Sequence, residues 1–443
     1  MGQRGVIAWV VAGAVLVGLS GAPGSSAPVA GQVPPGPPGP GLLPVPAPLP
    51  PGPPGEVLAS VPFASGPFPF TVEPHQVLYR STDRHGGSIP VSGYVLVPTG
   101  VPAPPGGRHV VAWAHGTSGI VDGCAPSLDA QSGGGLNSPD SYQQVVSLLA
   151  AGHIVTASDY PGLGTPGLHP YMDGFGEGRA VLDSIRAARA FGGTSTAVVV
   201  GFSQGGQAAI FAGEEQPGYA PDIDLRGVVS IGTPSLMGAA IAAGSPYASL
   251  GLAGLVTALP ELDRTEILTP SGEAEYDALI PLDRPDGPCV WPEFDFDRDM
   301  MVDPMDLPAW RASIESVYPG QRIVPAPVLL IQSESDEDVP APLAYHACNT
   351  LVAHGSDVRM WIYDDEDHVA SVVVSSHDRS RWVLDRLAGL AVDDTVAFAG
   401  EVPRVVIPCP AGEASEGGGS GAGAEEPAAR PATPVRSVAR FAG

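Results

Sequence analysis

Short apolar segments alternate with helical segments through most of the chain, and this alternation limits the folds open to it. Most of the apolar segments are short, β-branched and uninterrupted by charge, which is typical of strands buried on both faces of a parallel sheet. They are His109–Ala114, Ile154–Ser158, Ala197–Val200, Val228–Ile231, Val328–Ile331 and Val358–Tyr363. Between them lie the helical patterns Tyr142–Ala151, Gly176–Phe191, Gln204–Glu215 and Ala341–His354. The order predicts a doubly wound, mostly parallel α/β sheet, preceded by a hairpin from Val77–Tyr79 and Ser92–Val97.

One long segment interrupts this alternation. Between Ile231 and Val328 about a hundred residues pass without a clear strand, far more than an ordinary loop. The segment holds two helical patterns, Leu236–Leu259 and Arg264–Leu279. We therefore expect an inserted helical cap or lid, at about residues 235–322, over the carboxyl edge of the sheet, where open α/β sheets place their sites.

The two ends of the chain differ from its middle. Arg4 precedes the apolar run Val6–Leu19, and small residues follow, so residues 1–30 resemble a signal peptide and predict an exported protein. Residues 31–55 form a Pro/Gly-rich linker, and residues 411–443 lack large apolar side chains, which predicts a disordered tail. The folded body is thus expected at 56–410.

Charge and cysteine content restrict the partners. With 21 Lys and Arg against 47 Asp and Glu, the net charge of −26 disfavours nucleic acid. The cysteines Cys124, Cys289, Cys348 and Cys409 are even in number, so two disulfides are expected, with three possible pairings. Neither a metal-ligand spacing nor a dinucleotide-binding glycine motif is present, so we expect no cofactor and no metal. Oligomeric state cannot be read from the sequence.

The strongest motif is Gly201-Phe202-Ser203-Gln204-Gly205, a G-x-S-x-G sequence between a predicted strand and a predicted helix. In this context the serine occupies a sharp turn as a nucleophile, and the glycines allow strand and helix to approach closely. The helix N-terminus supplies positive partial charge near a developing oxyanion. We therefore predict that Ser203 is the nucleophile of an acyl-transfer reaction in an α/β-hydrolase fold.

A serine nucleophile needs a histidine base and an acid that orients it, in the chain order serine, acid, histidine. After the strand that ends at Ile331, Asp336 is the first choice for the acid, Asp338 the second and Glu334 the third. After the last strand, His368 is the expected base. The other late histidine, His377, falls in or near the following helix and is expected at the surface.

The oxyanion hole requires backbone N–H donors from two places. One donor is expected at Gln204, after the nucleophile. The second is expected at Thr117, in the loop after the strand His109–Ala114. His115 in that loop precedes the nucleophile and is interpreted as loop structure, and Asp159 as a turn residue.

Several motifs together resemble the secretory lipase family, typified by yeast lipase A and common in actinobacteria, over roughly residues 60–410. They are Trp113-Ala114-His115-Gly116-Thr117, Cys124-Ala125-Pro126-Ser127, Asp159-Tyr160-Pro161-Gly162-Leu163-Gly164, Asp183-Ser184-Ile185-Arg186-Ala187-Ala188-Arg189, Gly201-Phe202-Ser203-Gln204-Gly205-Gly206 and Asp336 with Val339-Pro340.

The resemblance implies a triad of Ser203, Asp336 and His368 and hydrolysis of triacylglycerols or shorter acyl esters by a secreted enzyme. It also implies the disulfides Cys124–Cys289 and Cys348–Cys409. The Pro-rich entry and the acidic loop before His368 depart from the family pattern. Alternatives on the same fold are an acyltransferase, a thioesterase or a peptidase. In other classes, the chain could be a non-catalytic cell-surface binding protein or an envelope structural protein.

Overall fold

The computed structural model describes residues 41–64, 68–132, 139–242, 245, 247–279, 295–392, 404–407 and 409. The predicted signal peptide, the start of the linker and the predicted tail lie outside these residues.

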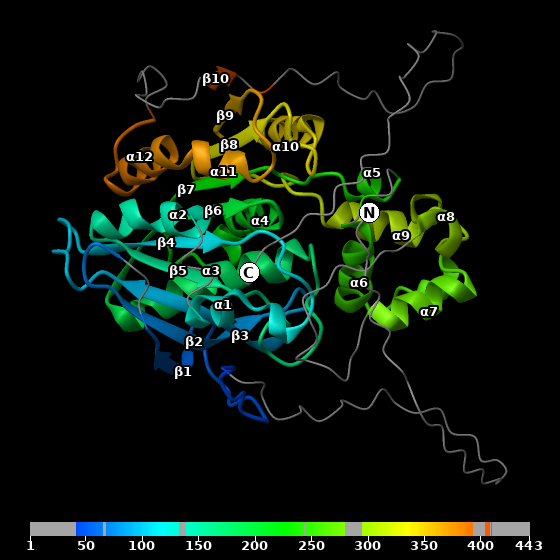
Figure 1. Ribbon diagram of the computed structural model, residues 1–443, viewed down its shortest axis with the longest axis horizontal. Helices are drawn as coiled ribbons and strands as arrows, with labels where there is room; N and C mark the ends of the chain where they lie inside the picture. Colours follow the sequence, from blue (N-terminus) through cyan, green and yellow to red (C-terminus); the bar gives the residue numbers. More distant parts are fainter. Residues whose placement is uncertain are drawn as a thin grey trace, which may run out of the picture. The chain divides into compact units, whose positions relative to one another are not determined.

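A ten-stranded sheet forms the centre of the molecule, in the order β1-β2-β3-β5-β4-β6-β7-β8-β9-β10 (Figure 1). All strands from β5 to β9 in this order pair in parallel, whereas β1, β2, β3 and β10 pair antiparallel at the two edges. The predicted mostly parallel sheet is therefore confirmed. The strands are β1 Val57–Pro62, β2 Glu73–Thr82, β3 Ser88–Val97, β4 Arg108–Ala114, β5 Ile154–Ser158, β6 Gly193–Phe202, β7 Asp224–Ile231, β8 Val328–Ser333, β9 Val358–Tyr363 and β10 Arg404–Ile407.

Helices cover both faces of the sheet, because successive residues of each central strand point to opposite sides. Val110 and Ala112 of β4 share one hydrophobic cluster with α3, α4 and α10, while Val111 between them shares the other with α2, α11 and α12. The helices of the body, with two 3-10 turns, are η1 Asp122–Cys124, α1 Pro126–Ser132, α2 Pro139–Ala150, α3 Gly174–Ala188, η2 Arg189–Phe191, α4 Gln204–Tyr219, α10 Ala341–Ala353, α11 Ala370–Val374 and α12 Ser376–Leu387.

The described part of the segment between β7 and β8 is mostly helical and lies beside the carboxyl end of the sheet (Figure 1). Its elements are α5 Met237–Ala242, α6 Ala248–Ala258, η3 Arg264–Glu266, α7 Pro270–Leu279, α8 Phe296–Asp299, η4 Pro304–Asp306 and α9 Pro308–Ser316. The single helix expected at 236–259 is therefore wrong, since two helices replace it. Gly244 and Pro246 stand between them in the sequence, and proline cannot donate a helical hydrogen bond.

Two cysteines, on α10 and after β10, are joined by the disulfide Cys348–Cys409, so the end of the body is tied to a central helix. Cys124 is also disulfide-bonded, and Cys289, its expected partner, lies outside the described residues. Over the part of the chain that was searched, no helix is both long and apolar enough to cross a bilayer.

Candidate active site

Ser203 stands at the turn between β6 and α4, in a backbone conformation that side chains rarely adopt. Its φ is 56° and its ψ is −121°. The main chain is held there from both sides: the Ser203 N–H donates to the Ile231 carbonyl at 2.8 Å, and the Ser203 carbonyl accepts from the Gly206 N–H at 2.7 Å. A strained non-glycine residue that its surroundings fix in this way is typical of functional sites.

Two glycines beside the serine allow the backbone segments to approach closely. A Cβ atom at Gly205 would lie 2.0 Å from the Ala114 carbonyl oxygen, and one at Gly201 would lie 1.9 Å from the Gly205 oxygen. A Cβ at Gly116 would lie 2.9 Å from the Phe202 ring. The loop after β4 therefore packs directly against the turn that carries Ser203.

Asp336 and His368 form a buried hydrogen-bonded pair. The Oδ2 atom of Asp336 lies 2.7 Å from Nδ1 of His368, and 4% of each residue is exposed. Asp336 accepts three further hydrogen bonds: from the Gln332 side chain at 3.1 Å, the Val339 N–H at 2.7 Å and the Asp338 N–H at 3.1 Å. These donors fix the orientation of the carboxylate.

The other two candidate acids are placed differently. Asp338 is bonded through its side chain to the hydroxyl of Tyr247, at the start of α6. Glu334 is exposed and accepts a hydrogen bond from the Tyr345 hydroxyl. Of the three carboxylates considered from the sequence, Asp336 is thus the one that meets His368.

The imidazole of His368 lies over the junction of β6 and β7. Its ring centroid is 4.7 Å from that of Phe202, and a Cβ at Gly232 would lie 2.8 Å from its Cε1 atom. Gly232 follows Ile231, whose carbonyl holds the Ser203 N–H. The imidazole therefore contacts the residues around the serine, although no hydrogen bond between described residues joins His368 to Ser203. Such bonds are often long in free enzymes and shorten when substrate binds.

The loop that carries His368 is anchored on both sides. The Ser333 hydroxyl donates to the Glu366 carbonyl at 2.6 Å, and the Ser371 hydroxyl donates to the His368 carbonyl at 2.7 Å. His377, the other late histidine, has a side chain that is 75% exposed on α12. This location agrees with the surface position expected for it.

Of the two residues expected at the oxyanion hole, Gln204 directly follows Ser203, and Thr117 lies in the loop after β4. Gln204 begins α4, and the first N–H groups of a helix have no partner within the helix. Thr117 belongs to the loop that packs on the turn, and its hydroxyl is 2.8 Å from that of Tyr171.

A buried polar cluster beneath the start of α4 escaped the sequence analysis. The Gln204 amide donates to Nε2 of His169 at 2.7 Å and to Oε1 of Glu177 at 2.8 Å. The same Glu177 oxygen accepts from the Met172 N–H at 2.9 Å. Burial raises the pKa of Glu177 to about 8 and lowers the pKa of His169 to about 3, because each group is favoured in its neutral form. His169 lies just before α3 and Glu177 within it, one helix and one strand ahead of Ser203 in the sequence. At that spacing the two residues form no recognisable motif.

Asp159 and His115, interpreted as structural residues, are both buried. The Asp159 carboxylate accepts from the hydroxyls of Ser92 and Ser127 at 2.7 and 2.6 Å, and so connects β3 to α1. Burial raises the pKa of Asp159 to about 6, and these serine donors oppose that shift. The His115 ring packs against the tilted ring of Tyr160 with centroids 4.2 Å apart, and burial lowers the pKa of His115 to about 4.

A mostly apolar pocket opens beside Ser203, between the body and the inserted helices. It encloses about 530 Å³ of empty space, part of it open to solvent. The lining residues are Tyr171, Met172, Ser203, Pro234, Leu236, Met237, Ala240, Ser245, Tyr247, Ala248, Asp338, Val339 and Leu343. No cluster of metal-ligating side chains occurs among the residues searched.

Comparison with known proteins identifies relatives for this chain. The model of the secretory lipase family matches residues 140–269, and that of the prolyl oligopeptidase family matches residues 300–389. The secreted triacylglycerol lipase LIP4 of Malassezia globosa is 28% identical over 348 residues, which cover 72% of this chain and 73% of the relative. A Mycobacterium tuberculosis protein named as a probable inactive lipase is 27% identical, over 74% of this chain and 77% of its own.

Among solved structures, lipase A of Candida antarctica in its closed state matches with a TM-score of 0.66 and 20% identity. The match covers 77% of this chain and 84% of that one. This likeness confirms the α/β-hydrolase fold expected from the sequence. The secretory lipase match and the related sequences show that the chain is similar to the secretory lipase family.

Proposed function

We propose that this secreted protein is a serine hydrolase that cleaves carboxylic esters, with Ser203 as nucleophile, His368 as base and Asp336 as the orienting acid. The observation that carries the proposal is the buried Asp336–His368 pair, which lies against the strained turn that bears Ser203. A serine hydroxyl at such a turn becomes reactive once an oriented imidazole can take its proton.

The reaction would proceed in two stages through an acyl-enzyme. His368 takes the Ser203 proton as the oxygen attacks the ester carbonyl, and Asp336 stabilises the imidazolium. The N–H groups of Gln204 and of the loop at Thr117 stabilise the negative charge on the carbonyl oxygen. His368 then protonates the leaving alcohol, and water activated by the same imidazole releases the acid.

The substrate class follows from the pocket and from the relatives. Leu236, Met237 and Leu343 give the wall beside Ser203 an apolar surface suited to an acyl chain. The Malassezia relative is named a triacylglycerol lipase. We therefore infer acyl esters of lipids as the substrates.

Replacing the nucleophile tests the proposal. Ser203→Ala should lower kcat for p-nitrophenyl esters by at least about 10⁴-fold, because the triad acts as a unit and only binding and oxyanion contacts remain. Ser335→Ala, which changes an exposed serine in the acid loop, is the matched control and should keep the activity. Circular dichroism should show both variants folded. Turnover retained by folded Ser203→Ala would overturn the assignment.

Two alternatives have support of their own and need separate readouts. The prolyl oligopeptidase match favours testing amide bonds beside esters and thioesters of rising acyl length. The relative named as an inactive lipase favours testing whether the serine reacts at all. A fluorophosphonate probe should label Ser203 in the wild-type protein and fail to label Ser203→Ala. Absence of wild-type labelling would favour a non-catalytic binding role.

A further inference from the structure

A buried tyrosine, Tyr171, contacts the loop that carries Thr117. Its side chain lines the pocket beside Ser203, and only 5% of the residue is exposed. Its hydroxyl is 2.8 Å from the hydroxyl of Thr117, and within the described part of the chain this is the one hydrogen bond of the Thr117 side chain. Burial raises the pKa of Tyr171, so the hydroxyl keeps its proton in neutral solution.

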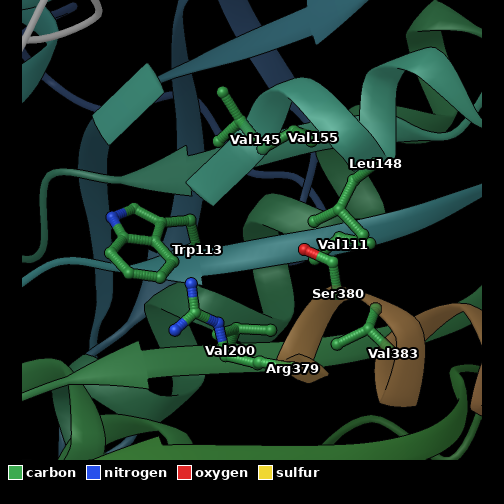
Figure 2. A pocket seen from close by; sticks show the side chains of 9 residues that line it. All are labelled: Val111, Trp113, Val145, Leu148, Val155, Val200, Arg379, Ser380 and Val383. Atoms are coloured by element: carbon green, nitrogen blue, oxygen red, sulfur yellow. The ribbon is translucent and has the colours of Figure 1, made fainter. Parts of the chain in front are cut away.

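The loop after β4 is supported at its root by packing. Trp113 of β4 lines a small hollow together with aliphatic side chains of α2 and α12 (Figure 2). Where the loop begins, the Tyr160 hydroxyl donates to the His115 carbonyl at 3.0 Å. Thr117 lies two residues beyond this support, and the contact with Tyr171 fixes the loop there.

The segment that carries Tyr171 also holds the far end of the same loop. The His169 N–H donates to the Ile120 carbonyl at 3.1 Å. The ring of His169 in turn accepts the hydrogen bond from the Gln204 amide at 2.7 Å. Residues 169–171 therefore contact both positions expected to supply the oxyanion hole, Thr117 through the tyrosine and Gln204 through the histidine.

The backbone at Tyr171 is itself fixed in place. Met172, the next residue, has a φ of 65°, which non-glycine residues rarely adopt. Its N–H donates to Glu177 at 2.9 Å, and its carbonyl accepts from the Gln207 amide at 3.2 Å. On another side, a Cβ at Gly254 of α6 would lie 2.0 Å from the Tyr171 carbonyl oxygen, so the inserted helix packs directly on this backbone.

We propose that Tyr171 is a positioning residue, whose hydroxyl holds Thr117 so that the N–H of this loop faces the carbonyl oxygen of the substrate. The inference rests on the proposed ester chemistry and deepens it. A donor accelerates the reaction only when it is aimed at the place where negative charge develops, so a small displacement weakens the transition state more than the bound ester. Because α6 packs on the same tyrosine, the position of the inserted helices is coupled to the oxyanion hole through this residue.

Removing the hydroxyl alone gives the first test. Tyr171→Phe keeps the ring in the pocket wall, and its kcat for a p-nitrophenyl ester should fall about 10- to 100-fold while KM stays within about twofold. Tyr345→Phe removes an exposed hydroxyl that bonds to Glu334 on the acid loop, and this matched control should keep the wild-type kcat. Circular dichroism should show both variants folded. A folded Tyr171→Phe with wild-type kcat, or with a raised KM alone, would overturn the inference.

A double-mutant cycle tests whether the two hydroxyls act through one bond. Thr117→Val removes the second hydroxyl but keeps the backbone N–H, so it should lose about as much kcat as Tyr171→Phe. The double variant should lose no more than the larger single loss, because the same interaction is removed in each case. Losses that multiply in the double variant would mean that the hydroxyls act independently, and would overturn the inference.

A transition-state analogue separates positioning from general structural damage. An alkyl boronic acid forms a tetrahedral adduct on a reactive serine, with an oxygen where the oxyanion develops. Its Ki should rise in Tyr171→Phe by the factor by which kcat/KM falls, whereas the Ki of octanol, which forms no adduct, should stay unchanged. Equal weakening of both inhibitors would indicate a merely structural tyrosine and would overturn the inference.

Failure of this inference can be told apart from failure of the proposed function. A wild-type protein that neither hydrolyses esters nor reacts with a fluorophosphonate would overturn the proposed function, and the role of Tyr171 with it. An active wild-type enzyme whose boronic acid affinity is unchanged in Tyr171→Phe would overturn the role of Tyr171 alone.

Discussion

At the scale of single residues, the acid loop shows how two nearby carboxylates acquire different surroundings. Asp336 accepts hydrogen bonds from two backbone N–H groups and one amide in addition to the imidazole of His368. Asp338, two residues later, faces the pocket and the Tyr247 hydroxyl. The difference arises because the chain turns after Asp336, so that the N–H groups of Asp338 and Val339 both donate to Oδ1 of Asp336.

This difference gives a prediction for the orienting acid. Asp336→Asn should lower kcat about 10⁴-fold, because an amide can hold the imidazole in the wrong tautomer and cannot stabilise its charge. Glu334→Gln changes an exposed carboxylate of the same loop and should stay within about twofold of wild type, as expected of surface groups. Steady-state kinetics on a p-nitrophenyl ester measure both. Comparable losses in the two variants would mean that Asp336 has no special role.

At the scale of elements, the approach of α4 to its neighbours is set by residues that lack a side chain. The backbone of β4 ends directly against Gly205, so the first turn of α4 fits between the loop after β4 and the end of β7. The far end of the same helix is different, since a Cβ at Gly218 would meet nothing within 4 Å.

The two glycines should therefore respond in opposite ways to alanine. Gly205→Ala should prevent the native fold or destabilise it by several kcal/mol, because the new methyl group overlaps a backbone carbonyl that cannot move freely. Gly218→Ala should raise the free energy of unfolding by about 0.5–1 kcal/mol, because alanine favours the helix. Urea unfolding measures both. A stable, active Gly205→Ala protein would show that the packing at this turn is looser than described.

The sequence predicted the central elements because their patterns are set by burial. Strands β4 to β9 lie under helices on both faces and therefore appear as continuous apolar runs. The edge strands β1 and β10 were not predicted, since β1 directly follows the Pro/Gly-rich segment and β10, after the last helix, has only four residues. Asp336 and His368, which the sequence paired, lie in hydrogen-bond contact. Glu177 and His169 were missed, because their partners come from elements that meet only in three dimensions.

At the scale of the whole molecule, many ionisable groups are buried in their neutral or hydrogen-bonded forms, and their effects on stability oppose one another. Burial raises the pKa of Asp159, Asp173 and Asp183 to about 6. Between about pH 4 and 6 the folded protein keeps protons on these carboxyl groups that the unfolded chain has released. Their contribution therefore lowers the free energy of unfolding as pH rises through this range. His115, His153 and His169 have lowered pKa values, so stability rises with pH until the histidines of the unfolded chain have lost their protons, about one unit above pH 6.5.

Above pH 6.5 the aspartates and histidines complete their titration with opposing effects, and Glu177 has the most strongly raised pKa among the acidic groups with a given value. Its pKa is raised from 4.5 to about 8, so the folded protein keeps a proton that the unfolded chain has released. Its contribution to stability is complete below pH 4.5 and is lost as pH rises to 8. Between pH 6.5 and 8 the Glu177 contribution to the free energy of unfolding should fall by about 1.6 kcal/mol, with a slope of about 1.4 kcal/mol per pH unit that halves by pH 8.

Glu177→Gln should abolish this slope, because the amide cannot ionise and its oxygen can still accept from Met172 and Gln204. Glu315→Gln, an exposed carboxylate on α9, should leave the slope as it is in the wild type. Urea unfolding at several pH values and constant ionic strength, with the disulfides intact, measures all three proteins. If wild type and Glu177→Gln lost stability in parallel between pH 6.5 and 8, the proton would reside on another group, and the buried cluster beneath Ser203 would be ionised throughout that range.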